Sequence, residues 1–204
     1  MKKLFVLGDS ISMDYGPYLQ QMLRNQFHYS RKGDDSGLLP TEREIENPYL
    51  INGGNSTKVL QYLQGRIGKQ LLEIDVLLLN CGLHDLVTID NVKQVHIENY
   101  KDNLTQMCEL LSNSRLQVCW VRTTPVMETM ANRTEKGFAR YNMDISLYNQ
   151  AADAIMASYG LPIADLHGFT LCLGDGAYRD GDHFTDKASE LQAAFLAGVL
   201  QQFV

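Results

Sequence analysis

The sequence has no CxxC pair, no long apolar run and no cluster of basic residues, and each absence excludes a class of protein. Its four cysteines are scattered, so they predict neither a zinc site nor a disulfide framework; they are Cys81, Cys108, Cys119 and Cys172. Lysine and arginine number 18 against 24 acidic residues, which gives a net charge of -6. This balance argues against a nucleic-acid partner.

The first apolar run of the chain, residues 4–7, is followed at once by Gly8 and Asp9. It is too short for a signal peptide, and nothing else in the sequence predicts a membrane span or a lipid anchor. We therefore expect a cytoplasmic protein with no membrane partner, unless a leader has been removed from it. No pattern in the sequence predicts an oligomeric state.

What the chain does have is enough apolar residues for one sizeable core. Its 204 residues, 45% of them hydrophobic, predict a single domain over residues 1–204. Apolar runs bounded by turn residues predict strands that are covered on both faces, at residues 4–7, 49–51, 76–79, 116–121 and 161–164. Apolar residues at helical spacing lie between them, in residues 19–27, 100–111 and 188–199.

This alternation of strands and helices predicts an α/β fold. Right-handed crossovers would give a three-layer α/β/α sandwich with a central parallel sheet of about five strands. Two longer irregular stretches interrupt the alternation. Residues 28–48 join a helix to a strand, so we expect them opposite the carboxyl ends of the strands, whereas residues 126–140 follow a strand and should overhang the ligand-binding edge.

Small or polar residues follow every predicted strand and should meet at that edge. The segments are GDS at 8–10, NGGNST at 52–57, NCGLHD at 80–85, TTP at 123–125 and DGDHFTD at 180–186. A serine hydroxyl needs a hydrogen-bonded base, usually a histidine that a carboxylate orients. His183 and Asp180 provide both for Ser10, with Asp182 as a less well placed carboxylate, and Thr185 is expected to cap the last helix.

Acyl transfer also needs hydrogen-bond donors for the oxyanion. The amide of Ser10, at the start of a helix, and the amide of Gly54, which has no side chain in the way, are candidates. From the sequence, Gly53 is an alternative to Gly54. A side-chain donor could come from His84, in the loop after the third predicted strand.

These four blocks resemble those of the SGNH, or GDSL-type, hydrolases. The order of GDSIS, NGGNS, NCGLHD and DGDHF matches that family over nearly the whole chain. The resemblance implies a flavodoxin-like fold, Ser10 as nucleophile, His183 as base, Asp180 as its acid and Gly54 as an oxyanion donor, with no metal or organic cofactor.

One position departs from the family pattern. The third block usually reads Gly-x-Asn-Asp, but here histidine follows Gly82-Leu83 and precedes Asp85. We expect a neutral His84 to replace the missing amide, with Asp85 or a backbone carbonyl selecting its tautomer.

The resemblance implies a serine esterase that hydrolyses carboxylic esters through an acyl-enzyme, and the family's substrates include lipid esters, thioesters and acetylated carbohydrates. The residues expected at the mouth of the site mix aromatic and polar character, which favours a short acyl group such as acetyl on a small-molecule or carbohydrate carrier. They are Met13, Tyr15, Arg122, Arg140, Tyr178 and Arg179.

Two other functions stay open from the sequence. In a metal-dependent phosphoesterase, Asp9, Asp180 and His183 would be ligands and Ser10 the phosphoryl acceptor. A non-catalytic ligand-binding protein could have kept the fold while its third block changed to histidine. The sequence contains no Gly-x-Ser-x-Gly elbow, no phosphate-binding loop and no HExxH motif, which excludes other common catalytic patterns.

Overall fold

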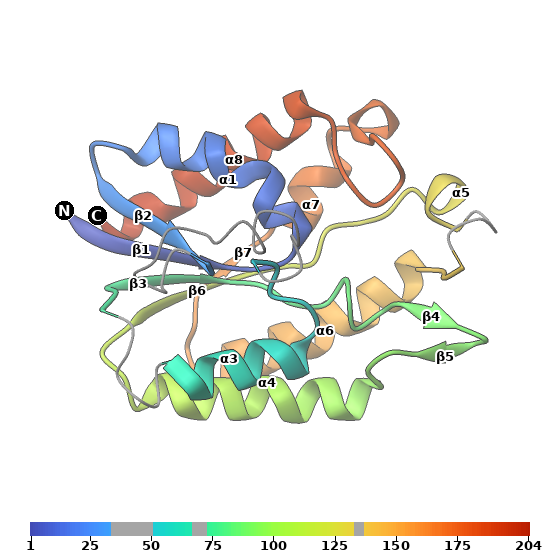
Figure 1. Ribbon diagram of the computed structural model, residues 1–204, viewed down its shortest axis with the longest axis horizontal. Helices are drawn as coiled ribbons and strands as arrows, with labels where there is room; N and C mark the ends of the chain where they lie inside the picture. The colour runs from blue at the N-terminus through green and yellow to red at the C-terminus, as the bar shows by residue number, and fades with distance from the viewer. Residues whose placement is uncertain (34–50, 67–72, 133–136) are drawn as a thin grey trace.

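The computed structural model describes residues 1–33, 51–66, 73–132 and 137–204 (Figure 1). Its main sheet has five parallel strands in the order β2-β1-β3-β6-β7. The strands are β1 (Lys2–Leu7), β2 (Phe27–Arg31), β3 (Val76–Leu79), β6 (Gln117–Val121) and β7 (Ile163–Ala164). The predicted parallel sheet of about five strands is confirmed.

Burial of the central strands explains their continuous apolar sequences. Leu4 to Leu7 of β1 and all four residues of β3 are buried, and Leu4 lies opposite Val76 while Leu7 lies opposite Leu79. A strand with helices on both sides has no face on which polar residues would meet water.

Helices cover both faces of the sheet, which confirms the three-layer α/β/α sandwich (Figure 1). One layer contains α1 (Ser10–Leu23), α7 (Leu166–Leu171) and α8 (Asp186–Leu200). The other contains α3 (Ser56–Arg66), α4 (Ile97–Ser112) and α6 (Asn142–Ser158). The predicted cap of the last helix is confirmed, because Thr185 Oγ1 accepts a hydrogen bond from the amide of Ala188 at 3.3 Å.

Short elements complete the described chain. An antiparallel hairpin of β4 (Thr88–Ile89) and β5 (Val92–Lys93) projects beyond the main sheet (Figure 1). The one-turn helix α5 (Glu128–Ala131) lies in the stretch after β6, and the 3-10 helices η4 (Asp175–Ala177) and η5 (Gln201–Phe203) flank α8. Within the described residues, no helix is both long and apolar enough to span a bilayer.

The second strand lies earlier in the chain than we expected. Residues 27–31 form β2, the edge strand beside β1. Phe27, which we expected at the end of a helix, is therefore the first residue of this strand. Residues 49 and 50 of the expected strand lie outside the described residues, and Ile51 is in a turn. Residues 34–48 of the first irregular stretch also lie outside them, so its expected position stays a prediction.

The strand order predicts where on the sheet a ligand would bind. The chain moves outward from β1 to β2 and then returns to place β3 on the other side of β1. In open parallel sheets the loops that follow the two strands at such a reversal form a crevice. Here these loops begin at Gly8 and at Asn80, which belong to the first and third sequence blocks.

Candidate active site

Ser10 is held at the start of α1 by the turn that follows β1. Asp9 caps the helix, since its Oδ1 accepts a hydrogen bond from the amide of Ile11 at 3.0 Å. Ser12 Oγ donates to the carbonyl of Asp9 at 2.6 Å and closes the same turn. The amide of Ser10 is at the first helical position, where the helix itself provides no acceptor for it.

The loop before α8 brings a histidine to this serine. His183 Nε2 lies 2.8 Å from Ser10 Oγ, and His183 Nδ1 lies 2.9 Å from Asp180 Oδ2. When Nδ1 carries the proton and donates to the carboxylate, Nε2 is left to accept the serine proton. The three side chains therefore form a continuous chain of hydrogen bonds that ends on the serine oxygen.

The carboxylate of Asp180 also organises the backbone of its loop. Its Oδ1 accepts hydrogen bonds from the amides of His183 at 2.9 Å and Asp182 at 3.2 Å. Burial acts to raise the pKa of Asp180, but these bonds and the charge of His183 outweigh it and hold the pKa below its ordinary value. Asp180 is therefore ionised at neutral pH, as an orienting group must be.

Asp182, the alternative carboxylate, faces a different partner. Arg140 Nη1 lies 3.0 Å from Asp182 Oδ1, with the two side chains only 7% and 4% exposed. Arg140 Nε also donates to the carbonyl of Leu83 at 2.7 Å. This buried pair joins the loop before α6 to the loop that carries His183.

A cavity of about 380 Å³ opens onto Ser10 and His183. Its volume is in the range of small-molecule sites. Apolar side chains form much of its wall and polar ones the rest; the other lining residues are Met13, Asn52, Leu83, His84, Val87, Phe138, Arg140 and Asp182. Of the six residues expected at the mouth, Met13 and Arg140 lie here.

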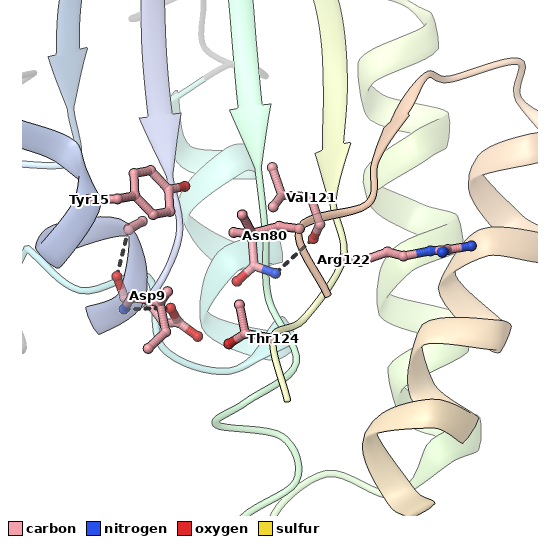
Figure 2. Close-up of a pocket in the computed structure, with 9 residues that line it drawn as sticks. Asp9, Tyr15, Asn80, Val121, Arg122 and Thr124 are labelled. Carbon is pink, nitrogen blue, oxygen red and sulfur yellow. Dashed lines mark hydrogen bonds between the residues drawn. The ribbon is translucent and has the colours of Figure 1, made fainter. Parts of the chain in front are cut away.

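Tyr15 and Arg122 line a separate, much smaller cavity beside the turn that follows β1 (Figure 2). Tyr15 is buried against the core, and Arg122 is paired with Asp153 at 2.6 Å and with Asp165 at 3.0 Å. Figure 2 shows the Arg122 side chain directed away from Asp9 and Asn80. The expectation that both residues lie at the mouth is corrected: packing and ion pairing occupy them elsewhere.

This smaller cavity, of about 10 Å³, has room for about one water molecule. Asp9, Asn80 and Thr124 contribute polar groups around it (Figure 2). The buried Thr124 Oγ1 has no hydrogen-bond partner in the described part of the chain, whereas Asn80 Nδ2 donates to the carbonyl of Val121 at 2.8 Å. The cavity thus lies against the turn that carries Ser10.

Tyr178 and Arg179 are the other two expected mouth residues, and neither lines the main cavity. The ring of Tyr178 packs against Phe184 with 5.0 Å between their centroids. Arg179, half exposed, pairs with Asp14 at 3.3 Å and lies 4.0 Å from Asp180. Both residues belong to the loop between η4 and α8 that also holds His183.

The second block lies directly beside the first. The amide of Gly53 donates to the carbonyl of Gly8 at 2.8 Å, and a side chain on Gly53 would come within 2.9 Å of that same oxygen. Gly54 has a φ of +76°, a conformation that favours glycine, and its amide donates to Asn52 Oδ1 at 2.8 Å. The amides of Gly53 and Gly54, two of the candidate oxyanion donors, are thus engaged within the protein.

His84 lines the main cavity as expected, but the partner expected to select its tautomer is occupied. Both oxygens of Asp85 accept from the amide of Ser56, at 2.9 and 3.0 Å. Burial lowers the pKa of His84 below its ordinary value; Asp9 opposes this shift, while Arg140 and Lys58 add to it. His84 is therefore neutral at pH 7.

Four cavity residues were not among the expected site residues: Asn52, Leu83, Val87 and Phe138. Asn52 and Leu83 stand inside the quoted sequence blocks, and Phe138 stands in the stretch expected to overhang the site. For these three residues, their position within those segments was the signal in the sequence that could have placed them at the site. Among the residues that the structure describes, no three His, Cys, Asp or Glu side chains cluster in a way that could hold a metal ion.

No protein-family model matches the chain. A protein of Mycoplasma pneumoniae, described only as an uncharacterized protein, is 28% identical over 144 residues; the match covers 67% of this chain and 15% of that protein. The chain therefore spans less than a sixth of the length of that relative.

Solved structures resemble the whole chain at low sequence identity. A lipase/acylhydrolase from Enterococcus faecalis has a TM-score of 0.71 and 16% identity, with 100% of this chain and 97% of that chain covered. A GDSL-like lipase from Bacteroides thetaiotaomicron has a TM-score of 0.70 and 17% identity, with coverages of 100% and 89%. An acetyl xylan esterase has a TM-score of 0.70 and 14% identity, with coverages of 97% and 99%. The chain therefore has the fold of the GDSL-type, or SGNH, hydrolases.

Proposed function

We propose that this protein is a serine hydrolase that cleaves carboxylic esters through an acyl-enzyme on Ser10. The observation that carries the proposal is the hydrogen-bonded chain from Ser10 through His183 to Asp180, with distances of 2.8 and 2.9 Å, at the wall of a cavity. Two proteins that share the fold are also named as esterases.

The geometry supports a two-step reaction. As Ser10 Oγ attacks the acyl carbon, His183 Nε2 takes the hydroxyl proton and Asp180 stabilises the resulting imidazolium. When the tetrahedral intermediate collapses, the alcohol leaves with that proton, and water then repeats the attack on the acyl-enzyme. The amide of Ser10 is placed to donate to the oxyanion, and no step requires a metal or an organic cofactor.

The cavity supports an ester with an apolar acyl group. Met13, Leu83, Val87 and Phe138 give one part of its wall apolar character. This wall favours an acyl chain longer than acetyl, in contrast to the short acyl group that the sequence alone favoured. The polar residues of the remaining wall, including Arg140, suit a carrier with hydrogen-bonding groups.

Labelling with a serine-directed fluorophosphonate tests the proposal. The wild-type protein, treated with the probe in the presence of EDTA, should carry one adduct, which peptide mass spectrometry maps to Ser10. Ser10→Ala should abolish the adduct and lower turnover of an activated ester by about 10⁶-fold. His183→Ala should prevent labelling, while His28→Ala, which alters an exposed histidine of β2, should not.

The two rival functions predict different results. A metal-dependent phosphoesterase would lose its activity in EDTA and hydrolyse phosphate esters rather than carboxylic esters. A binding protein without catalysis would fold normally and show neither an adduct on Ser10 nor turnover. Either result would contradict the serine hydrolase.

A further inference from the structure

The oxyanion needs a hydrogen-bond donor besides the amide of Ser10. The structure leaves few groups that could be this second donor. The amide of Gly53 is bonded to the carbonyl of Gly8 and the amide of Gly54 to the side chain of Asn52. A typical acyl-transfer site uses two or more donors that point at the developing charge. Another group of the cavity wall must therefore contribute.

Asn52 is held beside the nucleophile turn. It precedes Gly53, whose amide bonds to Gly8 two residues before Ser10. Asn52 is 7% exposed and lines the same cavity as Ser10 and His183. Asn52 is therefore a polar residue that is more than nine-tenths buried, at the wall where the acyl group would bind.

A hydrogen bond sets the orientation of the Asn52 carboxamide. A backbone N–H can only donate, so the side-chain atom that accepts from Gly54 must be the oxygen, Oδ1. Nδ2 consequently projects from the other arm of the amide. Across the described residues Nδ2 has no hydrogen-bond partner, and it is not among the fully buried polar atoms that lack one, so part of its surface is accessible, in a residue that lines the cavity.

His84 is less well suited to this task. Neither of its ring nitrogens has a hydrogen-bond partner in the described ranges, and Asp85 is engaged by Ser56. Nothing there selects the tautomer that would donate into the cavity. The amide of Asn52, in contrast, always presents N–H groups and is polarised by the bond from Gly54 to its oxygen.

We propose that Asn52 Nδ2 is the side-chain donor to the oxyanion, and that Gly54 acts by orienting it. The proposal rests on the serine hydrolase function proposed above and names a further catalytic residue for it. It makes His84 a wall residue of the cavity rather than the replacement for the missing amide.

Asn52→Asp separates catalysis from structure. An aspartate keeps an oxygen that can accept from Gly54 but replaces the donor Nδ2 with a carboxylate oxygen. We expect kcat for an activated ester to fall by about 10²- to 10³-fold, with KM and the melting temperature close to wild type. Asn52→Ala should lose kcat by a similar factor without adding charge, which excludes simple repulsion as the cause.

Asn55→Asp is the matched control. Asn55 is in the same loop, and its Oδ1 accepts from the amide of Lys58 at 3.1 Å, a bond that aspartate can also accept. Asn55 does not line the main cavity. This variant adds the same charge three residues away and should retain turnover near that of wild type.

The outcomes distinguish the two proposals. If the wild-type protein is labelled at Ser10 and Asn52→Asp keeps its kcat, the assignment of Asn52 is overturned while the serine hydrolase stands. A loss of about 10²-fold or more in His84→Ala would also overturn it, since that is the loss expected for the true donor. If folded wild-type protein is neither labelled nor active, both proposals fall.

Discussion

Ser10 and His183 are 173 residues apart in the chain, yet Ser10 Oγ lies 2.8 Å from His183 Nε2. The serine begins the first helix after β1, and the histidine lies in the last loop before α8, which packs beside that helix. The two ends of the chain thus share one layer of the sandwich (Figure 1). Four results would test this description of the site.

Asp180→Asn should lower turnover by about 10⁴-fold, because an amide at this position allows His183 to adopt the wrong tautomer. Ester hydrolysis at saturating substrate would measure the loss. Asp175→Asn is the control, because it removes the same charge from an exposed residue of η4. If Asp180→Asn retained most of its activity, Asp180 would not be the group that orients the histidine.

Arg140→Ala should lower the free energy of unfolding by roughly 3–5 kcal/mol, because it leaves Asp182 as a buried carboxylate without its arginine. Urea denaturation would measure the change. The double variant Arg140→Met/Asp182→Leu should lose less, since it removes both charges. Lys187→Ala breaks a pair of exposed side chains with Glu190 and should cost less than about 1 kcal/mol.

The prediction for Arg140 has a clear counter-result. If Arg140→Ala were no more destabilising than Lys187→Ala, the pair between Arg140 and Asp182 would not join the two loops in solution. A double variant that was as unstable as Arg140→Ala would show instead that packing of the arginine side chain, not its charge, supplies the stability.

Asp85 should make the protein less stable as the pH rises from about 4 to about 7. Burial raises its pKa from 3.8 to about 7, although hydrogen bonds from Ser56 oppose the shift. In this range the folded state holds a proton that the unfolded state has released, so the free energy of unfolding falls with rising pH. Asp85→Asn should therefore gain stability relative to wild type across the same range.

Urea midpoints at several pH values would measure this difference. Asp75→Asn is the control: Asp75 is exposed and also accepts a backbone hydrogen bond, from the amide of Lys3 at 2.7 Å. It should leave the pH dependence of wild type in place. A constant difference between Asp85→Asn and wild type at all pH values would show that Asp85 is ionised in the folded protein.

Val87→Phe should shift the substrate preference toward shorter acyl groups, because it fills part of the apolar wall. We expect kcat/KM for a hexanoyl ester to fall by at least about 10-fold relative to an acetyl ester, as one methylene in an apolar pocket is worth about 10- to 200-fold. Ile89→Phe is the control, since Ile89 is 54% exposed on the hairpin. An unchanged ratio would place the acyl group elsewhere.

Local patterns were sufficient for much of the fold. The buried runs at β1 and β3 and the cap at Thr185 are properties of a few consecutive residues, and the structure has them where they were expected. The edge strand was not predictable in this way. Residues 27–31 contain exposed and half-buried positions, so they lack the continuous apolarity of the inner strands.

Which residues line the cavity depends on the direction of each side chain as well as on its position in the sequence. Met13 and Tyr15 are two residues apart on α1, and a helix turns by about 100° per residue, so their side chains point to nearly opposite sides. Met13 faces the main cavity and Tyr15 the core. Proximity to Ser10 in the sequence could not distinguish them.

By itself, the sequence determined the alternation of strands and helices and the order of four polar blocks at the ends of strands. Apolar periodicity and turn residues act over a few positions, so they can be seen without a structure. Only the tertiary structure decided which carboxylate pairs with Arg140, which amides are already bonded, and that Asn52 shares a cavity with Ser10. Those contacts join loops far apart in the chain, and they depend on how the helices pack on the sheet.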